Sequence, residues 1–434
     1  MCRRRLASPG APGVEVDTMS TTSATTTVLA EPVELPCGLV LPNRILKAAM
    51  AEGLAHPWAA DVTPSLIRLY ERWADGGAGT LVTGVLCVER GAEGGTSVVL
   101  DDRTDTALLK QWAEAVHRRD TRLIGQIQHP GRQANVFATR HPMAPSALPP
   151  VRGSRLFGAS RAMTAAQVEA MVTRFADAAV MLEDAGFDGV ELHAAHGYLI
   201  GQFLSSETNF RHDDWGGDLP RRARFLLDIV RSIRRRVPPG FAVAVKINAS
   251  DFRPGGFDVE DSAAVVGMLG GEGVDLIEIS GGTYESPSGC LGVQPGEPGT
   301  ARDAYFAGMA PRLRAMTDVP LALTGGLRSR TVMERLISER TVDVIGLGRP
   351  LIERPNLPEG LLGGASDGIV LTPCPLPPRL EVFWWLNQFR RLGNGCDFDP
   401  DYSARQAQRD TVIGLLTQVA ATTRAHAVGL LKRQ

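Results

Sequence analysis

The chain has 434 residues, of which 44% are hydrophobic and 22% charged, and its formal net charge is -2 at pH 7. This balance gives no electrostatic reason to expect nucleic acid or an anionic membrane as a partner. No apolar run approaches the roughly 18 residues of a membrane span, so we expect a cytoplasmic globular protein with one large core or two modest domains.

The 6 cysteines are scattered along the chain and form no C-x-x-C pair. A compact zinc or iron–sulfur motif and a disulfide framework are therefore not expected. We interpret the cysteines as reduced thiols, which agrees with the expected cytoplasmic location.

Residues 1–30 are rich in Ser, Thr, Ala, Gly and Pro and poor in aromatic side chains. Such a composition predicts a disordered N-terminal arm. Its basic start is interrupted by Glu15 and Asp17 and is followed by no continuous apolar stretch, so a targeting peptide is not expected. The sequence leaves open whether Met1 or Met19 is the natural start.

From about residue 40 onwards, a short apolar run is followed repeatedly by a loop and then by a helical stretch. Apolar runs typical of strands occur at 44–50, 79–85, 122–128, 187–193, 241–248, 274–280, 319–326 and 342–348. Apolar residues recur every three or four positions in the segments 64–77, 108–120, 166–186, 221–237, 259–273 and 331–341. Several of these helical segments end at glycine just before the next strand, where helices commonly stop.

About eight such units predict an α/β protein with a parallel sheet covered by helices. A closed (β/α)8 TIM barrel and a doubly wound open sheet both fit this alternation. Eight units over roughly 310 residues favour the barrel, whose usual size is about 250 residues plus insertions. The open sheet would also predict G-x-G-x-x-G after the first strand, and residues 51–58 lack it. We therefore predict a single barrel domain over 31–365.

Two segments fall outside the repeating units. The long insertion at 132–163 is expected to form a lid or excursion over the barrel mouth. Residues 366–434 are expected to form a C-terminal extension that packs on the barrel, with a helix at 380–393.

Polar side chains stand where the third, fourth and fifth strands end, and in TIM barrels functional groups project from these ends. His193 ends the fourth strand, and His196 and Tyr198 lie in the loop after it. Gln126 lies at the end of the third strand and Lys246 at the end of the fifth. A buried lysine is costly unless it meets an anion or a polarised oxygen, so we expect a ligand near Lys246.

The loops after the seventh and eighth strands carry Gly325, Gly326, Gly348 and Arg349. In TIM barrels these two loops frequently bind a phosphate group. Glycines let backbone N–H groups approach the phosphate oxygens, and arginine can donate two hydrogen bonds to them. For each motif alone, a tight turn or a surface charge is the alternative, and their occurrence together favours a phosphate site.

The neighbouring groups indicate which molecule carries the phosphate. The Gln126 amide offers both a donor and an acceptor to the edge of a pyrimidine-like ring. Lys246 supplies positive charge near the same place. An isoalloxazine ring needs both, so FMN fits this set of residues without a dinucleotide-binding fold.

The histidines and the tyrosine suggest the reaction. Two imidazole N–H groups that converge on one oxygen would polarise the carbonyl of an α,β-unsaturated substrate and hold the developing enolate. Tyr198, with a reference pKa near 10, can donate the proton to the α-carbon. A metal pair and a structural histidine are the alternatives, but no third ligand of fitting spacing is evident for a metal, so none is expected.

These residues resemble the Old Yellow Enzyme family of FMN-dependent ene-reductases over almost all of 31–400. The similarity is strongest in LPNRILKAAM, GQIQHPGRQA, APSAL, GVELHAAHGYLIGQFLSSETNFRHDDWGG, RFLLDIVRSIR, RDAYFAGMAPRLRA, TGGLRSR and GLGRP. The resemblance implies a (β/α)8 barrel, non-covalent FMN, NADH or NADPH as reductant, and ping-pong transfer to a small-molecule activated alkene. It makes His193 and His196 the substrate-carbonyl pair and Tyr198 the proton donor.

The same resemblance assigns the cofactor contacts. It makes Gln126 and Lys246 the flavin-ring contacts, and it places the phosphate at Gly325, Gly326, Gly348 and Arg349. The first strand of the family usually ends in Pro-Met followed by Thr or Cys beside the flavin, whereas this chain has Ala49, Met50 and Ala51. Ala51 therefore lacks the hydroxyl or thiol that tunes the flavin in many members, and Lys246 replaces a frequent arginine.

Longer members that demethylate amines or reduce dienoyl-CoA carry an iron–sulfur cluster and further domains, and neither is expected here. We therefore predict an NAD(P)H-dependent FMN oxidoreductase that reduces activated alkenes. A flavin-dependent dehydrogenase or demethylase of a small metabolite and a flavin-binding protein with little turnover are the alternatives. The sequence leaves open the physiological substrate, the choice between NADH and NADPH, and whether the chain forms a homo-oligomer.

Overall fold

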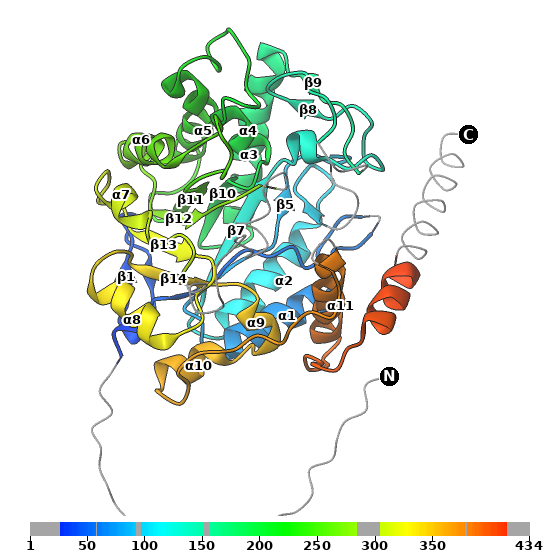
Figure 1. Cartoon of the computed structure of the whole chain (residues 1–434), viewed down its shortest axis with the longest axis vertical. Coiled ribbons are helices and arrows are strands. Elements are labelled where there is room, and N and C mark those ends of the chain that lie inside the picture. The colour runs from blue at the N-terminus through cyan, green and yellow to red at the C-terminus, as the bar shows by residue number, and fades with distance from the viewer. Residues whose placement is uncertain are drawn as a thin grey trace, which may run out of the picture.

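A ring of parallel strands surrounded by helices forms the centre of the protein in a computed structural model (Figure 1). The structure describes residues 27–57, 59–92, 97–151, 156–283, 304–377 and 380–414. Within these ranges the ring consists of β3 (Ile45–Lys47), β4 (Thr80–Val82), β7 (Arg122–Gln128), β10 (Gly189–Ala194), β11 (Ala242–Asn248), β12 (Leu276–Ser280), β13 (Leu321–Thr324) and β14 (Val344–Leu347). Pairing of β10 with β7 closes the ring, so the predicted (β/α)8 barrel is confirmed.

The helices that follow the strands cover the outside of the barrel. They are α1 (Pro64–Asp75), α2 (Thr106–His117), α3 (Ala165–Asp184), α5 (Leu219–Arg234), α6 (Val259–Gly270), α7 (Ala310–Arg314) and α8 (Arg330–Ser338). Local sequence explains several starts, since Thr63 accepts a hydrogen bond from the Leu66 amide and Thr164 forms a reciprocal capping box with Gln167. The short α7 was not among the predicted helices.

Two apolar clusters fill the barrel wall and its lower interior. Outward-facing strand residues such as Val190 and Leu192 pack against the helices. Inward-facing residues, including Ile124 and Leu276, form a second cluster together with Leu41. Leu41 belongs to the hairpin of β1 (Val33–Glu34) and β2 (Val40–Leu41), so this hairpin contributes to the plug at the N-terminal ends of the strands.

The inward-facing positions change from apolar to polar along the strands. Ile124 precedes Gln126 on β7, and Leu276 precedes Glu278 on β12, with all four side chains buried. Because alternate residues of a strand share one face, the polar side chains lie above the apolar plug at the C-terminal ends. The fold therefore places a polar, buried layer directly beneath the barrel mouth.

Several smaller elements surround the mouth. They are β5 (Leu86–Cys87), β6 (Val98–Val99), η2 (Gly131–Gln133), β8 (Met143–Ala144), β9 (Arg161–Ala162) and α4 (Leu199–Leu204). β8 and β9 pair with each other within the predicted 132–163 insertion. α4 follows β10 and holds the loop with His196 and Tyr198 against the barrel.

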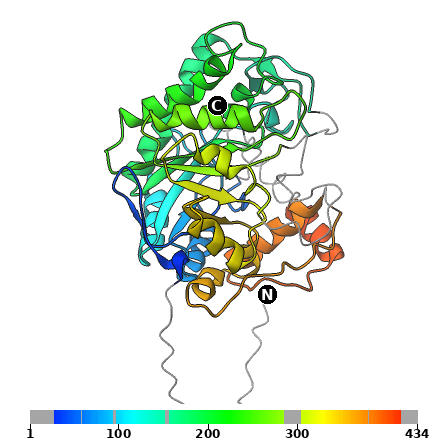
Figure 2. The same cartoon turned by 60° about the vertical axis from the view of Figure 1, so that its left-hand side comes forward.

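The chain beyond the last strand returns to the barrel through α9 (Pro350–Glu353), α10 (Leu357–Leu362) and α11 (Glu381–Gly393) (Figures 1 and 2). α11 packs against α1, where the Phe389 and Trp73 rings meet edge to face at 6.1 Å. Arg68 Nε also donates to the Gly393 carbonyl over 3.0 Å. These contacts attach the C-terminal part of the chain to the first helix of the barrel.

Three expectations need comment. Most of the predicted arm at 1–30 lies outside the described residues, but η1 (Val28–Ala30) is folded and its Leu29 is fully buried, so these residues do not belong to an arm. The expectation of reduced thiols throughout is wrong, because Cys396 is disulfide-bonded. Among the residues described, none of the helices is both long and apolar enough to cross a membrane.

Candidate functional site

The imidazoles of His193 and His196 lie together at the C-terminal end of β10. Their ring centroids are 5.0 Å apart with nearly perpendicular planes, and His193 Nε2 lies 3.3 Å from His196 Nδ1. His196 has a φ of 58°, a left-handed conformation that costs about 1 kcal/mol or more for a residue with a side chain. The Asn248 side chain accepts from the His196 amide over 3.1 Å and helps to hold this turn.

The hydrogen bonds define the protonation pattern of the pair. The Ala195 amide donates to Nδ1 of His193, so Nε2 of His193 carries the proton and donates to Nδ1 of His196. Nε2–H of His196 then donates to the Ser280 hydroxyl over 2.8 Å. Burial, the neighbouring imidazole and Lys246 lower the pKa of His193 well below its usual range. Burial and Lys246 lower the pKa of His196 to about 3, so both rings are neutral at pH 7.

Tyr198 completes this cluster from the start of α4, where it is the N-cap residue. Its ring centroid lies 4.8 Å from that of His193, with an angle of 65° between the planes. The structure therefore brings together the three residues predicted for catalysis, two neutral imidazoles and one phenol, at one edge of the barrel mouth.

A buried polar layer lies beneath these rings and consists of Gln126, Glu191, Lys246 and Glu278. Gln126 Nε2 donates to Glu191 Oε1, and Lys246 Nζ donates to Glu278 Oε1, each over 2.6 Å. Glu191 and Glu278 are both 0% exposed. The anion expected near Lys246 is thus a side chain of the protein, whereas the sequence argument looked for it in a ligand.

The two carboxyl groups of this layer differ in their protonation. Burial and the nearby Glu278 raise the pKa of Glu191 well above its usual value. Burial alone would raise the pKa of Glu278 as well, but the charge of Lys246 outweighs it and lowers the pKa to about 2. Sequence reasoning missed both residues, although a charged residue at an inward position of an otherwise apolar strand is a usable signal.

The predicted phosphate residues stand at the ends of β13 and β14. Gly325 and Gly326 have φ values of 140° and 74°, which a residue with a side chain rarely adopts. A Cβ atom added at Gly348 would lie 3.6 Å from Met50 Sδ, so Gly348 is next to the end of β3. These loops lie side by side because β13, β14 and β3 are neighbours in the barrel.

Arg349, at the start of α9, already has a partner. Its Nη1 donates over 3.0 Å to Glu381 Oε1 on α11, and this oxygen also accepts from Trp385 Nε1 over 2.8 Å. The structure therefore places the predicted phosphate-binding arginine between the barrel and the C-terminal part of the chain. This pairing was not predictable from the sequence, because the two residues lie 32 positions apart in segments whose packing depends on the fold.

A second buried lysine, Lys47, holds the loop after β3 in place. The sequence analysis did not consider this residue. Lys47 Nζ donates to Glu52 Oε1, Tyr70 Oη and the Val82 carbonyl over 3.3, 2.9 and 2.8 Å. The Gly84 amide donates to the same Tyr70 oxygen over 2.7 Å. This cluster ties the loops after β3 and β4 to α1, and Ala49 and Met50 lie in the first of these loops, half-buried.

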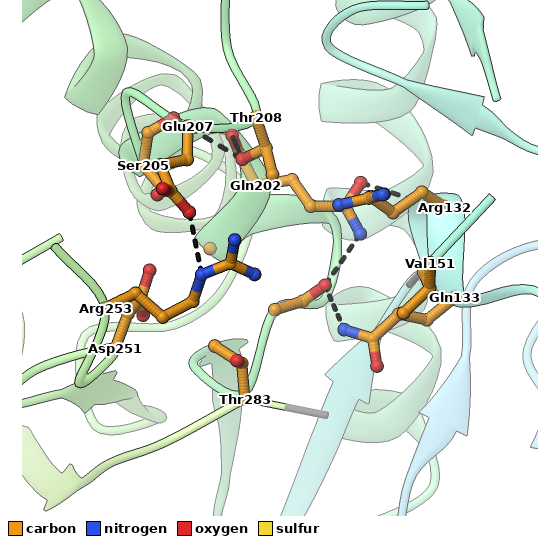
Figure 3. Close-up of a pocket in the computed structure, with 12 residues that line it drawn as sticks. Arg132, Gln133, Val151, Gln202, Ser205, Glu207, Thr208, Asp251, Arg253 and Thr283 are labelled. Carbon is orange, nitrogen blue, oxygen red and sulfur yellow. Dashed lines mark hydrogen bonds and ion pairs between the residues drawn. The ribbon is translucent and has the colours of Figure 1, made fainter. Parts of the chain in front are cut away.

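A small hollow that opens to solvent lies beside Gly197 in the loop that carries the histidines (Figure 3). Two glutamines that line the hollow hold the His196–Gly197 turn. Gln133 Nε2 donates to the His196 carbonyl over 2.9 Å, and Gln202 Nε2 donates to the Gly197 carbonyl over 2.7 Å. Val151 lines the same hollow, so the 132–163 insertion reaches the loop that carries the histidines. In the part of the chain that the structure describes, no three His, Cys, Asp or Glu side chains form a group that could hold a metal ion.

Comparisons with known proteins agree with this arrangement. The sequence profile of the NADH:flavin oxidoreductase / NADH oxidase family matches residues 29–367. The NADH-dependent flavin oxidoreductase iliE of Hypocrea jecorina (strain QM6a) is 36% identical over 388 residues, which cover 82% of this chain and 94% of that protein.

Solved structures share the barrel. Morphinone reductase in complex with tetrahydroNAD is similar at 25% identity with a TM-score of 0.66, over 83% of this chain and 93% of that chain. An Old Yellow Enzyme homologue from Zymomonas mobilis has a TM-score of 0.67 at 22% identity, over 79% of this chain and 94% of that chain. The second likeness supports the fold alone.

Proposed function

The chain belongs to the NADH:flavin oxidoreductase / NADH oxidase family, and we propose that it reduces activated alkenes. Membership confirms three expectations from the sequence, namely the resemblance to Old Yellow Enzymes, the FMN cofactor and the nicotinamide reductant. The finer proposal is that an α,β-unsaturated carbonyl compound accepts hydride at its β-carbon and a proton at its α-carbon. The observation that carries it is the convergence of two neutral imidazoles and a phenol at the barrel mouth.

The residues around the mouth fit FMN. Gln126 keeps its amide oxygen as an acceptor, because its Nε2 is the atom that donates to Glu191. The two glycines after β13 have positive φ values, which residues with a side chain rarely adopt, and such backbone conformations can present N–H groups to a phosphate. The residues proposed to hold FMN are Gln126 and Lys246 at the ring edge, Ala49 and Met50 beside the ring, and Gly325, Gly326, Gly348 and Arg349 at the phosphate. When bound and reduced by NAD(P)H, FMN supplies the hydride.

His193 and His196 are proposed to hold the substrate carbonyl. In the free site, the Nε2–H group of His193 donates a hydrogen bond to Nδ1 of His196. A carbonyl oxygen that enters between them accepts a hydrogen bond from this N–H group, and His196 must then present Nδ1–H to the same oxygen. The Ser280 hydroxyl permits this change of tautomer, because it accepts from Nε2–H in the free site and can donate to bare Nε2 in the complex.

The neutral state of the pair suits this role. Two neutral donors stabilise the enolate oxygen as negative charge develops, and this is the differential stabilisation that lowers a barrier. Tyr198 donates its phenolic proton to the α-carbon and is reprotonated from solvent. The overall reaction takes two electrons and one proton from NAD(P)H and a second proton from water, and it converts the double bond to a single bond.

The proposal is tested with purified protein saturated with FMN. We expect NADH or NADPH oxidation that depends on added 2-cyclohexenone or maleimide under anaerobic conditions, with the saturated ketone or succinimide as product. Nicotinamide oxidation that needs no alkene, or that yields no reduced product, would favour another acceptor or a small-metabolite dehydrogenase. FMN binding without any turnover would favour a flavin-binding role.

A further inference from the structure

The polar layer beneath the histidines crosses four neighbouring strands of the barrel. Gln126 on β7 is the register partner of Glu191 on β10, and Lys246 on β11 is the register partner of Glu278 on β12. Glu191 lies two residues before His193 and therefore shares its inward face. All four residues are at most 2% exposed, so water does not satisfy their side chains.

The donors and acceptors of this layer do not balance when both carboxyl groups are ionised. Glu191 Oε1 accepts from Gln126 and Glu278 Oε1 accepts from Lys246, but the Oε2 atom of each carboxyl is buried and has no hydrogen-bond partner. The two carboxyl groups act on each other inside the barrel, and each raises or lowers the pKa of the other. Two buried, unpaired acceptors of like charge in one interior are unfavourable, and one proton between them satisfies both.

The charges around the layer also indicate that the two carboxyl groups retain one proton. Lys246 is the cation that pairs with Glu278, and Thr324 on β13 brings only a neutral hydroxyl near that carboxylate, without a hydrogen bond to it. His193 and His196 face the layer from above as neutral rings. Lys47 on β3 also acts on Glu278 through its charge, but it is paired with its own carboxylate, Glu52, and this pair is neutral as a unit. Lys246 therefore remains as the one cation for the two carboxyl groups, and a single retained proton makes the set neutral.

We propose that Glu191 and Glu278 share one proton, and that they act as positioning residues for the two side chains assigned to the flavin ring. Glu278 is the ionised partner and fixes the Lys246 ammonium. Glu191 is the acid: its Oε2–H donates to Glu278, and its carbonyl Oε1 accepts from Gln126. The Gln126 amide is thereby held with its oxygen free for the ring. The second half of this inference rests on the proposed placement of FMN, whereas the shared proton does not.

The shared proton is tested on the protein without FMN, by infrared spectroscopy with 13C-labelled glutamate at pH 7. We expect the C=O stretch of one carboxylic acid in the wild type. We expect it to be absent from both Glu191→Gln and Glu278→Gln, because either substitution leaves a single carboxylate to pair with Lys246. Glu52→Gln, which removes another buried glutamate beside a lysine, is the matched control and should keep the band.

Two results would overturn the shared proton. One is a wild type that has no carboxylic acid band, a measurement that needs no variant to fold. The other is a band that persists in Glu278→Gln, since Glu191 would then be protonated through burial alone. Neither result depends on alkene reduction, so failure of this inference is distinguishable from failure of the proposed function.

The positioning role is tested by the affinity for FMN, followed by quenching of flavin fluorescence. Glu191→Gln keeps an oxygen that can accept from Gln126, and we expect it to bind FMN nearly as tightly as the wild type. Glu191→Leu removes this acceptor and lets the amide turn, and we expect binding weaker by about tenfold, the equivalent of one hydrogen bond. Equal affinities for the Gln and Leu variants would contradict the positioning role.

Discussion

The hydroxyl of Ser280 provides the sharpest test of how the paired histidines work. It lies 2.8 Å from Nε2 of His196 and is the only group in the described hydrogen-bond network that contacts this nitrogen. In the proposed complex the hydroxyl must donate to Nε2 while Nδ1–H of His196 turns to the substrate. Ser280→Ala leaves Nε2 without a partner in both states, as a donor in the free site and as an acceptor in the complex, and an unpaired buried group costs about 1–3 kcal/mol. We expect affinity for a phenolate that mimics the enolate to fall, by at most roughly 150-fold, because part of this cost is already present in the free site.

The assay is a titration of the FMN-loaded protein with a substituted phenol, followed by the change in flavin absorbance. Ser280→Thr keeps a hydroxyl and is the matched control, so we expect it to bind the phenol close to wild-type strength. FMN affinity should be unchanged in the Ala variant, because Ser280 is not among the residues assigned to the cofactor. Phenol affinity that is equal in the Ala variant and the wild type would refute the tautomer argument.

Three further predictions concern the remaining groups. Tyr198→Phe should slow alkene reduction by about 100-fold or more, the usual contribution of a general acid, while reduction of FMN by NAD(P)H survives in stopped-flow traces. Glu381→Gln should release Arg349 from its ion pair and strengthen FMN binding by about 2-fold to 5-fold, because a partly exposed ion pair contributes a free energy of that size. Binding of riboflavin, which has no phosphate, should be unchanged. Folding lowers the pKa values of His193 and His196, so both histidines become protonated near pH 6.5 in the unfolded chain but stay neutral in the folded chain. Stability should therefore be fully present above pH 6.5 and fall below it by up to about 1.4 kcal/mol per pH unit for each histidine, as measured by urea unfolding.

Each of these predictions has a contrary outcome. Equal slowing of both half-reactions in Tyr198→Phe would remove Tyr198 as the proton donor, and Tyr402→Phe is the control for loss of a phenol far from the barrel mouth. If Glu381→Gln changes riboflavin and FMN binding alike, Arg349 does not act on the phosphate. An unfolding free energy that varies with pH to the same extent when both histidines are replaced by asparagine would contradict the assigned neutral rings.

The barrel strands were predictable from the sequence because each is a short apolar run between a helix and a loop. Strand β11 occupies 242–248, within the predicted 241–248, and the other strands lie inside the predicted ranges or differ by a residue or less. Short elements such as α7 were missed, because five residues do not show a helical period. The N-terminal boundary was harder for a different reason, since η1, which contains the buried Leu29, packs against α8 and α10 from far later in the chain.

The site was predictable only where its residues stand at strand ends. His193 and Tyr198 are close in the sequence, and their proximity in space follows from one strand and one loop. Glu191 and Glu278 have partners on other strands, and which strands are neighbours and in what register is decided by closure of the barrel. The Arg349–Glu381 pair depends in the same way on where the C-terminal helix docks.

The central claim is that paired neutral imidazoles hold the substrate oxygen while Tyr198 stands ready to protonate the α-carbon. The most direct measurement is a crystal structure of the FMN-loaded protein with a bound phenol. We predict that the phenol oxygen lies within hydrogen-bonding distance of both His193 Nε2 and His196 Nδ1, with the Tyr198 hydroxyl facing the ligand ring. A ligand held by other residues, or imidazoles that still bond to each other beside an occupied mouth, would contradict it.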